Sequence, residues 1–249
     1  MLIKEDVRIT PFRLKRTLHI YLPDDLKEGE RVPVIYMFDG HNLFLDEDAT
    51  YGTSWGLSED LTAYGKKLMI VGIECNHKNN QRLFEFSPYI FIDPTFGKIK
   101  GKGKLLFKWI VEELKPYIDS KYPTLSSREY TSIGGSSMGG LMALYGGIAH
   151  SDVFSKALCL SPYVYHCTKS ILADIKKYHL HDDTSFYVSF GSEEVRGKKD
   201  LVYYIDRLFA IERDLCEKAL IKMYIYKNHK HCEAAWRKET KTWLKDLHY

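Results

Sequence analysis

The most informative stretch of this chain is Ile133-Gly134-Gly135-Ser136-Ser137-Met138-Gly139-Gly140-Leu141. It contains the pattern Gly-x-Ser-x-Gly centred on Ser137, after a strand-like run and before a helical pattern that begins at Leu141. The two glycines remove side chains that would collide where a strand turns sharply into a helix. The serine at the apex would present its hydroxyl at the helix N-terminus, where the dipole favours developing negative charge. The stretch therefore predicts a nucleophilic serine on a strand–turn–helix.

Extended and helical patterns alternate on both sides of this turn. Residues 7–10 and 17–22 alternate polar and apolar side chains, as antiparallel strands do, whereas 32–38 and 68–73 are continuous apolar runs typical of buried parallel strands. Further strands are expected at 130–133, 157–160, 186–190 and 223–226, and helices at 57–64, 103–119, 138–149, 168–178, 199–217 and 233–246. This order predicts an α/β fold with a mostly parallel central sheet, antiparallel N-terminal strands and helices on both faces.

The chain is expected to form one domain over residues 1–249, because it shows neither an internal repeat nor a linker. One connection, residues 76–102, is long, irregular and rich in aromatic residues, proline and glycine. Long loops in compact domains are usually functional. We therefore expect residues 76–102 to form a wall or lid of the substrate pocket.

The composition excludes several classes of protein. The 36 basic and 33 acidic residues nearly balance, which argues against a dedicated nucleic-acid binder. The one basic cluster, residues 98–104, is interpreted as a solvated loop, with attraction of an anionic substrate as the alternative. No apolar run suggests a secretory signal or a membrane span. Five cysteines lack the spacing of a disulfide framework and predict reduced thiols in a cytoplasmic protein. The oligomeric state stays open, a homo-oligomer included.

A serine hydroxyl needs a base, an orienting acid and an oxyanion site before it attacks a carbonyl carbon. In hydrolases with this turn, the order along the chain is serine, acid, histidine. His231 follows the last expected strand and opens the final helix, which is where the base should lie, and His229 is the alternative. The acid should leave the preceding strand, where the candidates are Glu193, Glu194 and Asp200.

The oxyanion site requires two N–H donors. One is expected from Met138, which follows the serine, and the second from the loop 38–44, where Gly40 lets the backbone approach a substrate closely. The His-Lys-His-Cys run at 229–232 has no carboxylate or further cysteine at metal-ligand spacing. No metal and no organic cofactor are therefore expected.

Several motifs match one known family in order, from about residue 10 to 246. They are Tyr36–Phe44, Arg82–Pro88, residues 107–122 around Glu113-Leu114-Lys115-Pro116, Gly134–Leu141, Leu160-Ser161-Pro162, Gly191–Glu194 and His231–Trp236. On these motifs the chain resembles the putative esterase family of the α/β-hydrolase superfamily, with its esterase D-like, feruloyl esterase-like and siderophore esterase-like members. The resemblance implies an α/β-hydrolase fold and a serine esterase.

Carried over by position, the resemblance implies Ser137 as nucleophile, His231 as general base and Glu194 as acid, where many relatives have aspartate. For the oxyanion hole it points to Met138, Gly40 and His41.

The expected activity is hydrolysis of a small-molecule carboxylic ester through an acyl-enzyme. Two alternatives keep the same fold: an acyltransferase that uses the same triad, and a non-catalytic binding module. Three aromatic residues are candidates for the substrate pocket: Trp55, Tyr163 and Tyr165. The natural ester is undetermined, because this fold and triad support many ester chemistries, siderophore-lactone and feruloyl hydrolysis among them.

Overall fold

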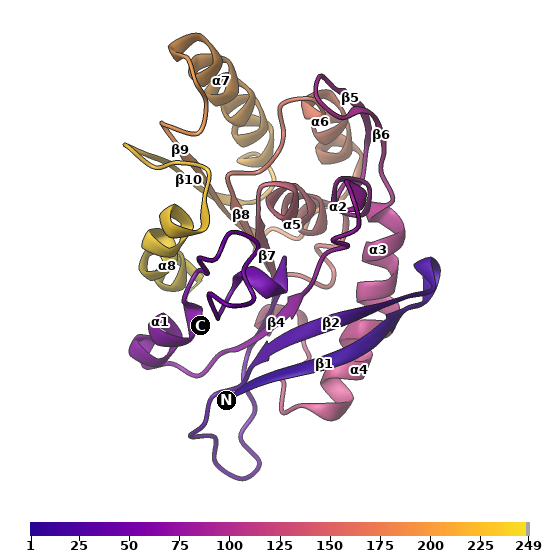
Figure 1. Ribbon diagram of the computed structural model, residues 1–249, viewed down its shortest axis with the longest axis vertical. Coiled ribbons are helices and arrows are strands. Elements are labelled where there is room, and N and C mark those ends of the chain that lie inside the picture. Colours follow the sequence, from indigo (N-terminus) through magenta and orange to yellow (C-terminus); the bar gives the residue numbers. More distant parts are fainter. Residues whose placement is uncertain (248–249) are drawn as a thin grey trace.

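The computed structural model describes residues 1–247, so the last two residues of the expected domain lie outside it. Its sheet is built from β1 (Leu2–Ile9), β2 (Leu14–Tyr21), β3 (Val34–Phe38), β4 (Met69–Ile73), β7 (Thr131–Ser136), β8 (Lys156–Leu160), β9 (Ser185–Gly191) and β10 (Leu220–Tyr226). Their order is β1-β2-β4-β3-β7-β8-β9-β10 (Figure 1). β2 pairs antiparallel with β1 and β4, and every other pairing is parallel. The mostly parallel sheet with an antiparallel start is confirmed.

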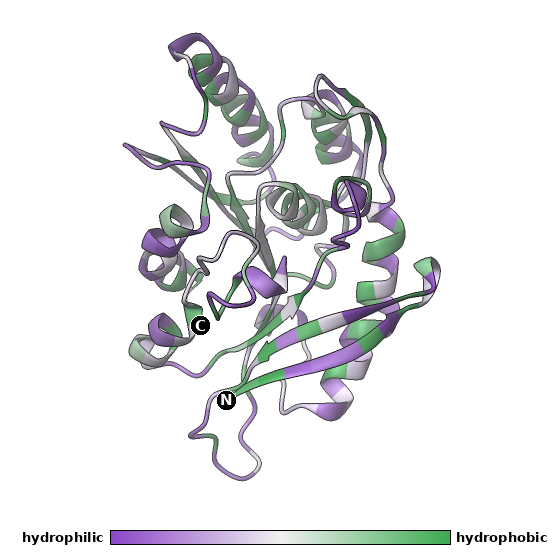
Figure 2. Ribbon diagram, in the orientation of Figure 1, coloured by the Kyte–Doolittle hydropathy of each residue, from purple (hydrophilic) through white to green (hydrophobic). Residues whose placement is uncertain are grey.

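Both faces of the parallel strands are buried, which explains their continuous apolar sequences. In β3, Val34, Tyr36 and Phe38 belong to one core cluster, whereas Ile35 and Met37 belong to a second cluster on the opposite face. Successive side chains of a strand point to opposite faces, so each face needs its own helical cover. Figure 2 shows the central strands as largely hydrophobic and the surrounding loops as largely hydrophilic.

The helices form two layers on the sheet (Figure 1). The first core cluster contains residues of α3 (Gly103–Trp109), α4 (Lys115–Lys121), α5 (Met138–Ala149), α6 (Thr168–Lys177) and α7 (Lys198–Leu215). The second contains residues of α1 (Leu57–Tyr64) and α8 (Glu233–Leu247). Helices on both faces are therefore confirmed. Between residues 1 and 247, no helix combines the length and the apolar character that crossing a membrane requires.

The helix expected over residues 103–119 changes its geometry in the middle. α3 continues into a π-helical segment, Ile110–Leu114, before α4 begins. Pro116 lies in the first turn of α4, and its missing N–H removes one helical hydrogen bond. The wider π-helical turn thus ends two residues before Pro116, which has no N–H to donate.

The connection 76–102 is more regular than expected, and the expectation of an irregular loop was wrong. It contains α2 (Gln81–Glu85) and a separate antiparallel hairpin of β5 (Ile90–Asp93) and β6 (Gly97–Lys100). The Asp93 carboxylate accepts the N–H groups of Thr95 and Phe96 and closes the turn between the two strands. Strands of four residues are too short for a period to be recognised in the sequence.

Candidate active site

Ser137 lies at the sharp turn between β7 and α5, with φ 58° and ψ −119°. A serine rarely adopts a positive φ, which costs of order 1–3 kcal/mol and persists only where the surroundings enforce it. Here the Ser137 N–H donates to the Leu160 carbonyl, and the Ser137 carbonyl accepts from Tyr163. A Cβ on Gly135 would lie only 2.8 Å from the Gly139 backbone, so the turn closes only with glycine there. The sequence expectation for this turn matches its geometry.

His231 and Glu194 meet at the same end of the sheet. His231 Nδ1 lies 2.7 Å from Glu194 Oε2. The other carboxylate oxygen, Oε1, accepts the Gly191 N–H and the Ser161 hydroxyl, each at 2.6 Å. The Glu194 side chain is 3% exposed and the His231 side chain 39%, so the acid is enclosed while the imidazole reaches the surface of the pocket. This is the arrangement that orients a base through its remote nitrogen.

The other two acid candidates lie elsewhere. Glu193 and Asp200 are exposed, and Asp200 lies in the first turn of α7. Among the described residues, neither is paired with a histidine. Only Glu194 of the three contacts His231.

Ser161 and Trp236 hold the acid in place and were not singled out as functional from the sequence. Trp236 Nε1–H donates to Ser161 Oγ at 2.8 Å, and this hydroxyl in turn donates to Glu194. The Trp236 ring also meets the His231 ring edge-on, with 5.0 Å between centroids. Both residues belong to motifs of the family resemblance, which was the available signal. We class them as positioning residues because they act through Glu194 and His231.

Ser161→Ala should lower kcat by roughly tenfold with little change in KM, because a hydrogen bond to a carboxylate contributes about 1.5–3 kcal/mol and only part of it is lost in the transition state. The comparison is with Trp236→Phe, which keeps an aromatic ring, although a smaller one, and removes the N–H donor; it should act in the same direction. Steady-state kinetics on a chromogenic ester measures both. An increase in KM alone would show that Ser161 serves substrate binding instead.

Ser137 and His231 line the same pocket, with a volume of about 280 Å³. Its other lining residues are mostly polar: Asp39, His41, Asn42, Thr50, Tyr51, Arg82, Ser136, Glu233 and Trp236. Ser137 Oγ makes no hydrogen bond within residues 1–247. Catalytic hydrogen bonds often form only when substrate is bound, so a shared pocket is the relevant observation.

His229, the alternative base, makes its side-chain contacts outside this pocket. Its ring stacks on Tyr226, with 4.8 Å between centroids, and its Nδ1 lies 3.5 Å from the buried carboxylate of Glu239. It is absent from the residues that line the Ser137 pocket.

Glu239 makes stability depend on pH. Burial raises its pKa to about 7 from 4.5, although the Tyr187 hydroxyl donates to the carboxylate. Between these values the folded protein holds a proton that the unfolded chain has released, so this group's contribution to stability is lost as pH rises from 4.5 to 7. Glu239→Gln removes this pH-dependent contribution to stability. Its free energy of unfolding relative to wild type should rise by up to about 3 kcal/mol between pH 5 and pH 8. Urea unfolding at both pH values measures it, and a pH-independent difference would contradict the assignment.

Three backbone N–H groups are free to bind an oxyanion. Within residues 1–247, the N–H groups of Gly40, His41 and Met138 have no hydrogen-bond acceptor. Met138 is the first residue of α5, and Gly40 and His41 begin the short 3-10 helix Gly40–Asn42. Gly40 is required there, because a Cβ would lie 2.4 Å from the Gly72 backbone. Burial lowers the pKa of His41 to about 4, so its imidazole is neutral.

An ion pair supports the loop that carries Gly40 and His41. Arg82 Nε and Nη2 donate to the two Asp39 oxygens at 2.7 and 2.6 Å. Burial alone would raise the pKa of Asp39, but the charge and hydrogen bonds of Arg82 lower it below its usual value. Arg82 comes from the connection 76–102 and lines the pocket. This segment therefore contributes to the pocket wall through Arg82.

The three aromatic pocket candidates do not line the pocket of Ser137. Trp55 is 2% exposed and packs against Trp236. The Tyr163 hydroxyl donates to Asp93, and Tyr165 packs in an aromatic group with Tyr203 and Tyr204. Their positions are explained by packing, and the surfaces nearest Ser137 are polar.

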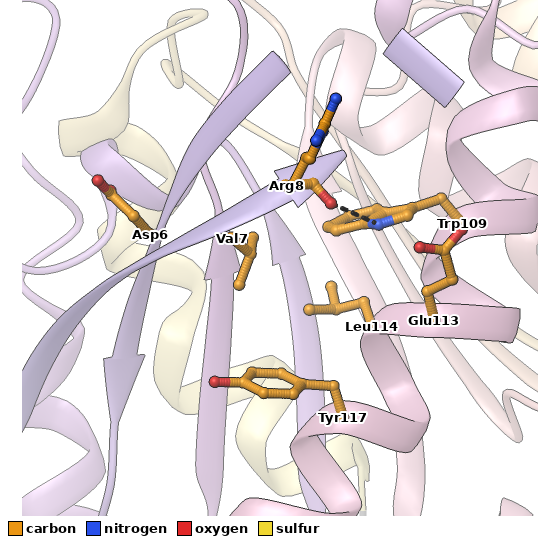
Figure 3. Close-up of a pocket in the computed structure, with 7 residues that line it drawn as sticks. All are labelled: Asp6, Val7, Arg8, Trp109, Glu113, Leu114 and Tyr117. Carbon is orange, nitrogen blue, oxygen red and sulfur yellow. Dashed lines mark hydrogen bonds between the residues drawn. The ribbon is translucent and has the colours of Figure 1, made fainter. Parts of the chain in front are cut away.

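A second cavity, of about 330 Å³, lies between β1 and the helical segment from α3 to α4 (Figure 3). It is lined by Asp6, Val7, Arg8, Trp109, Glu113, Leu114 and Tyr117, and Trp109 Nε1–H donates to the Arg8 carbonyl. None of these residues is a serine, cysteine or histidine, so this cavity lacks a nucleophile and base of the kind that Ser137 and His231 provide.

Comparisons with known proteins found similar proteins by sequence and by structure. The family model described as "Putative esterase" matches residues 11–248. The siderophore triacetylfusarinine C esterase of Aspergillus fumigatus is 26% identical over 223 residues, which are 86% of this chain and 74% of that protein. Among solved structures, the BES protein from Bacillus cereus has a TM-score of 0.76 at 21% identity, covering 100% of this chain and 95% of that one. An IroE-like serine hydrolase from Shewanella oneidensis has a TM-score of 0.77 at 18% identity, covering 99% and 79%. At these identities the structures show a common fold.

Proposed function

Because the chain belongs to the putative esterase family and is a carboxylic ester hydrolase, we propose that it cleaves its ester by attack of Ser137 Oγ, with an acyl-enzyme as intermediate. The observation that carries the proposal is the 2.7 Å bond between His231 and Glu194 beside a pocket that Ser137 shares. A histidine oriented by a buried carboxylate is the base that a serine nucleophile needs.

In the first half of the reaction, His231 Nε2 takes the Ser137 proton while Oγ attacks the ester carbonyl. Glu194 stabilises the imidazolium that forms. The tetrahedral oxyanion is bound by the Met138 N–H and by the Gly40-His41 loop, where each donor lowers the barrier by about 3 kcal/mol. The imidazolium then protonates the leaving alcohol, and water repeats the attack on the acyl-enzyme with His231 as base.

Labelling with a fluorophosphonate tests the activated serine without assuming a substrate. One adduct per chain is expected on Ser137, identified by intact-protein mass spectrometry and peptide mapping. His231→Ala should lose the adduct, whereas His229→Ala should keep it. Failure of wild type to react would reject Ser137 as the activated nucleophile.

The polar lining favours an ester whose acyl part carries hydrogen-bonding groups. Asn42 Nδ2 contacts the buried carboxylate of Glu233, and Thr50 and Tyr51 also face the pocket. Since the similar protein from Aspergillus fumigatus is a siderophore esterase, siderophore-type esters are the first class to test. We expect triacetylfusarinine C to be cleaved with at least roughly tenfold higher kcat/KM than p-nitrophenyl octanoate. The opposite order would reject this substrate class.

Product analysis separates hydrolysis from acyl transfer. Added acceptor alcohols should leave the free acid as the main product, because the mechanism uses water for deacylation. Dominant formation of a new ester would assign the alternative acyltransferase activity.

The cysteines are consistent with a cytoplasmic location, which we propose. All five are free thiols: Cys75, Cys159, Cys167, Cys216 and Cys232. Reduced thiols persist in the cytosol, whereas oxidising compartments favour disulfides.

A further inference from the structure

Three side chains that commonly bind metals converge behind the loop that carries the oxyanion donors. One ring nitrogen of His41, the Cys75 sulfur and one ring nitrogen of His77 all lie within 4.8 Å of one another. His41 follows β3, and Cys75 and His77 follow β4, its parallel neighbour. The carboxyl ends of neighbouring parallel strands meet at one edge of the sheet, which brings the two loops together.

In His41 and in His77, one ring nitrogen is held by an oxygen and the other is available to bind a metal ion. His41 Nε2 lies 2.9 Å from the Thr50 hydroxyl, and its Nδ1 is buried without a partner among residues 1–247. His77 Nε2 lies 2.8 Å from Glu74 Oε1, and its Nδ1 lies 3.9 Å from Cys75 Sγ. In metal sites, the second nitrogen of a ligating histidine is usually held by an oxygen in this way. A buried nitrogen without a partner is otherwise costly.

We propose that His41 Nδ1, Cys75 Sγ and His77 Nδ1 bind a zinc-type divalent cation, with water as the fourth ligand. Tetrahedral zinc with bonds of about 2.3 Å to sulfur and 2.0–2.1 Å to nitrogen places these ligand atoms about 3.5 Å apart. The 3.9 Å separation of Cys75 Sγ and His77 Nδ1 therefore needs only a small adjustment. His77 can supply it, because its side chain is 52% exposed.

The neighbouring carboxylate of Asp39 is not one of the proposed ligands, because Arg82 already engages it. Asp39 lies beside Cys75, but both of its oxygens accept hydrogen bonds from Arg82. Burial and Asp39 raise the pKa of the Cys75 thiol. Binding is therefore an exchange in which the cation forms the bond to sulfur and the thiol proton leaves to solvent. Because His41 also lines the Ser137 pocket, the cation would tie the oxyanion loop to the loop after β4.

Cobalt titration tests the site without relying on esterase activity. Chelator-treated protein should bind one equivalent of Co²⁺, with tetrahedral d–d bands and a thiolate-to-cobalt charge-transfer band, and Zn²⁺ should displace it. Cys75→Ala should lose the charge-transfer band. His77→Ala should weaken binding by more than roughly tenfold, the smallest loss typical of an outer-shell partner.

Matched variants separate this site from other thiols and histidines. Cys232→Ala and His229→Ala test the His-Lys-His-Cys run at 229–232, and Cys216→Ala tests an exposed thiol. All three variants should bind Co²⁺ as wild type does. His77→Ala replaces a half-exposed side chain, so its metal-free melting temperature should equal that of wild type, and Zn²⁺ should raise only the wild-type value. A missing charge-transfer band in wild type, or a band that survives Cys75→Ala, would overturn the proposal.

Discussion

Ser137→Ala should lower kcat for ester hydrolysis by about 10⁵-fold or more, the scale of loss when a serine nucleophile is removed. The variant keeps the backbone of the turn, because alanine meets the same steric demand at φ 58° as serine does. Its melting temperature should therefore stay close to that of wild type. Steady-state kinetics on a chromogenic ester, with circular dichroism for the fold, measures both quantities.

Ser136 provides the matched control for this substitution. It precedes Ser137, lines the same pocket and is 6% exposed, yet it is the last residue of β7 and lies before the turn. Ser136→Ala should retain kcat within a few-fold of wild type. Loss of activity in Ser136→Ala, with Ser137→Ala still active, would transfer the nucleophile to the neighbouring serine.

Glu194→Gln should lower kcat by about 10⁴-fold, as loss of the acid does in related triads. Glu194 accepts three hydrogen bonds, from Gly191, Ser161 and His231. A glutamine of the same shape must turn its NH₂ group toward one set of donors. It then either loses the bonds that hold it or stabilises the wrong tautomer of His231. The measurement is kcat across the pH range in which wild type is active.

Glu193→Gln and Asp200→Asn are the controls for the acid. Both side chains are exposed, so both variants should stay within about twofold of wild type, as surface substitutions usually do. Combining Ser137→Ala with Glu194→Gln should cost no more than Ser137→Ala alone, because the triad acts as a unit. A large loss in Glu193→Gln or Asp200→Asn, with Glu194→Gln active, would reassign the acid.

The sequence alone determined the order and kind of the main elements. The helices expected at 57–64 and 138–149 have the same bounds as α1 and α5. Each of the eight main strands overlaps a predicted apolar or alternating run, but β1 begins at Leu2, five residues before the expected start. These features depend on side-chain periodicity and on glycine sterics at the Ser137 turn, which act between residues close in the chain.

The prediction from the sequence failed for short strands and for side chains whose partners are distant in the chain. The hairpin of β5 and β6 was read as an irregular loop, since its four-residue strands carry no recognisable period and its turn depends on the Asp93 side chain. Trp55, Tyr163 and Tyr165 were expected near the substrate because they are aromatic. Their partners are distant in sequence, so only packing reveals that they lie outside the Ser137 pocket.

Which side chains meet depends on the tertiary structure. The residues alone left Glu193, Glu194 and Asp200 open, and the family resemblance pointed to Glu194. The fold brings Glu194 against His231 and places Ser161, with Trp236 behind it, on the same carboxylate. It also brings His41 to Cys75 and His77. Such contacts are set by the register of parallel strands and by the course of the loops at their carboxyl ends, and no pattern within one segment encodes a distance between two of them.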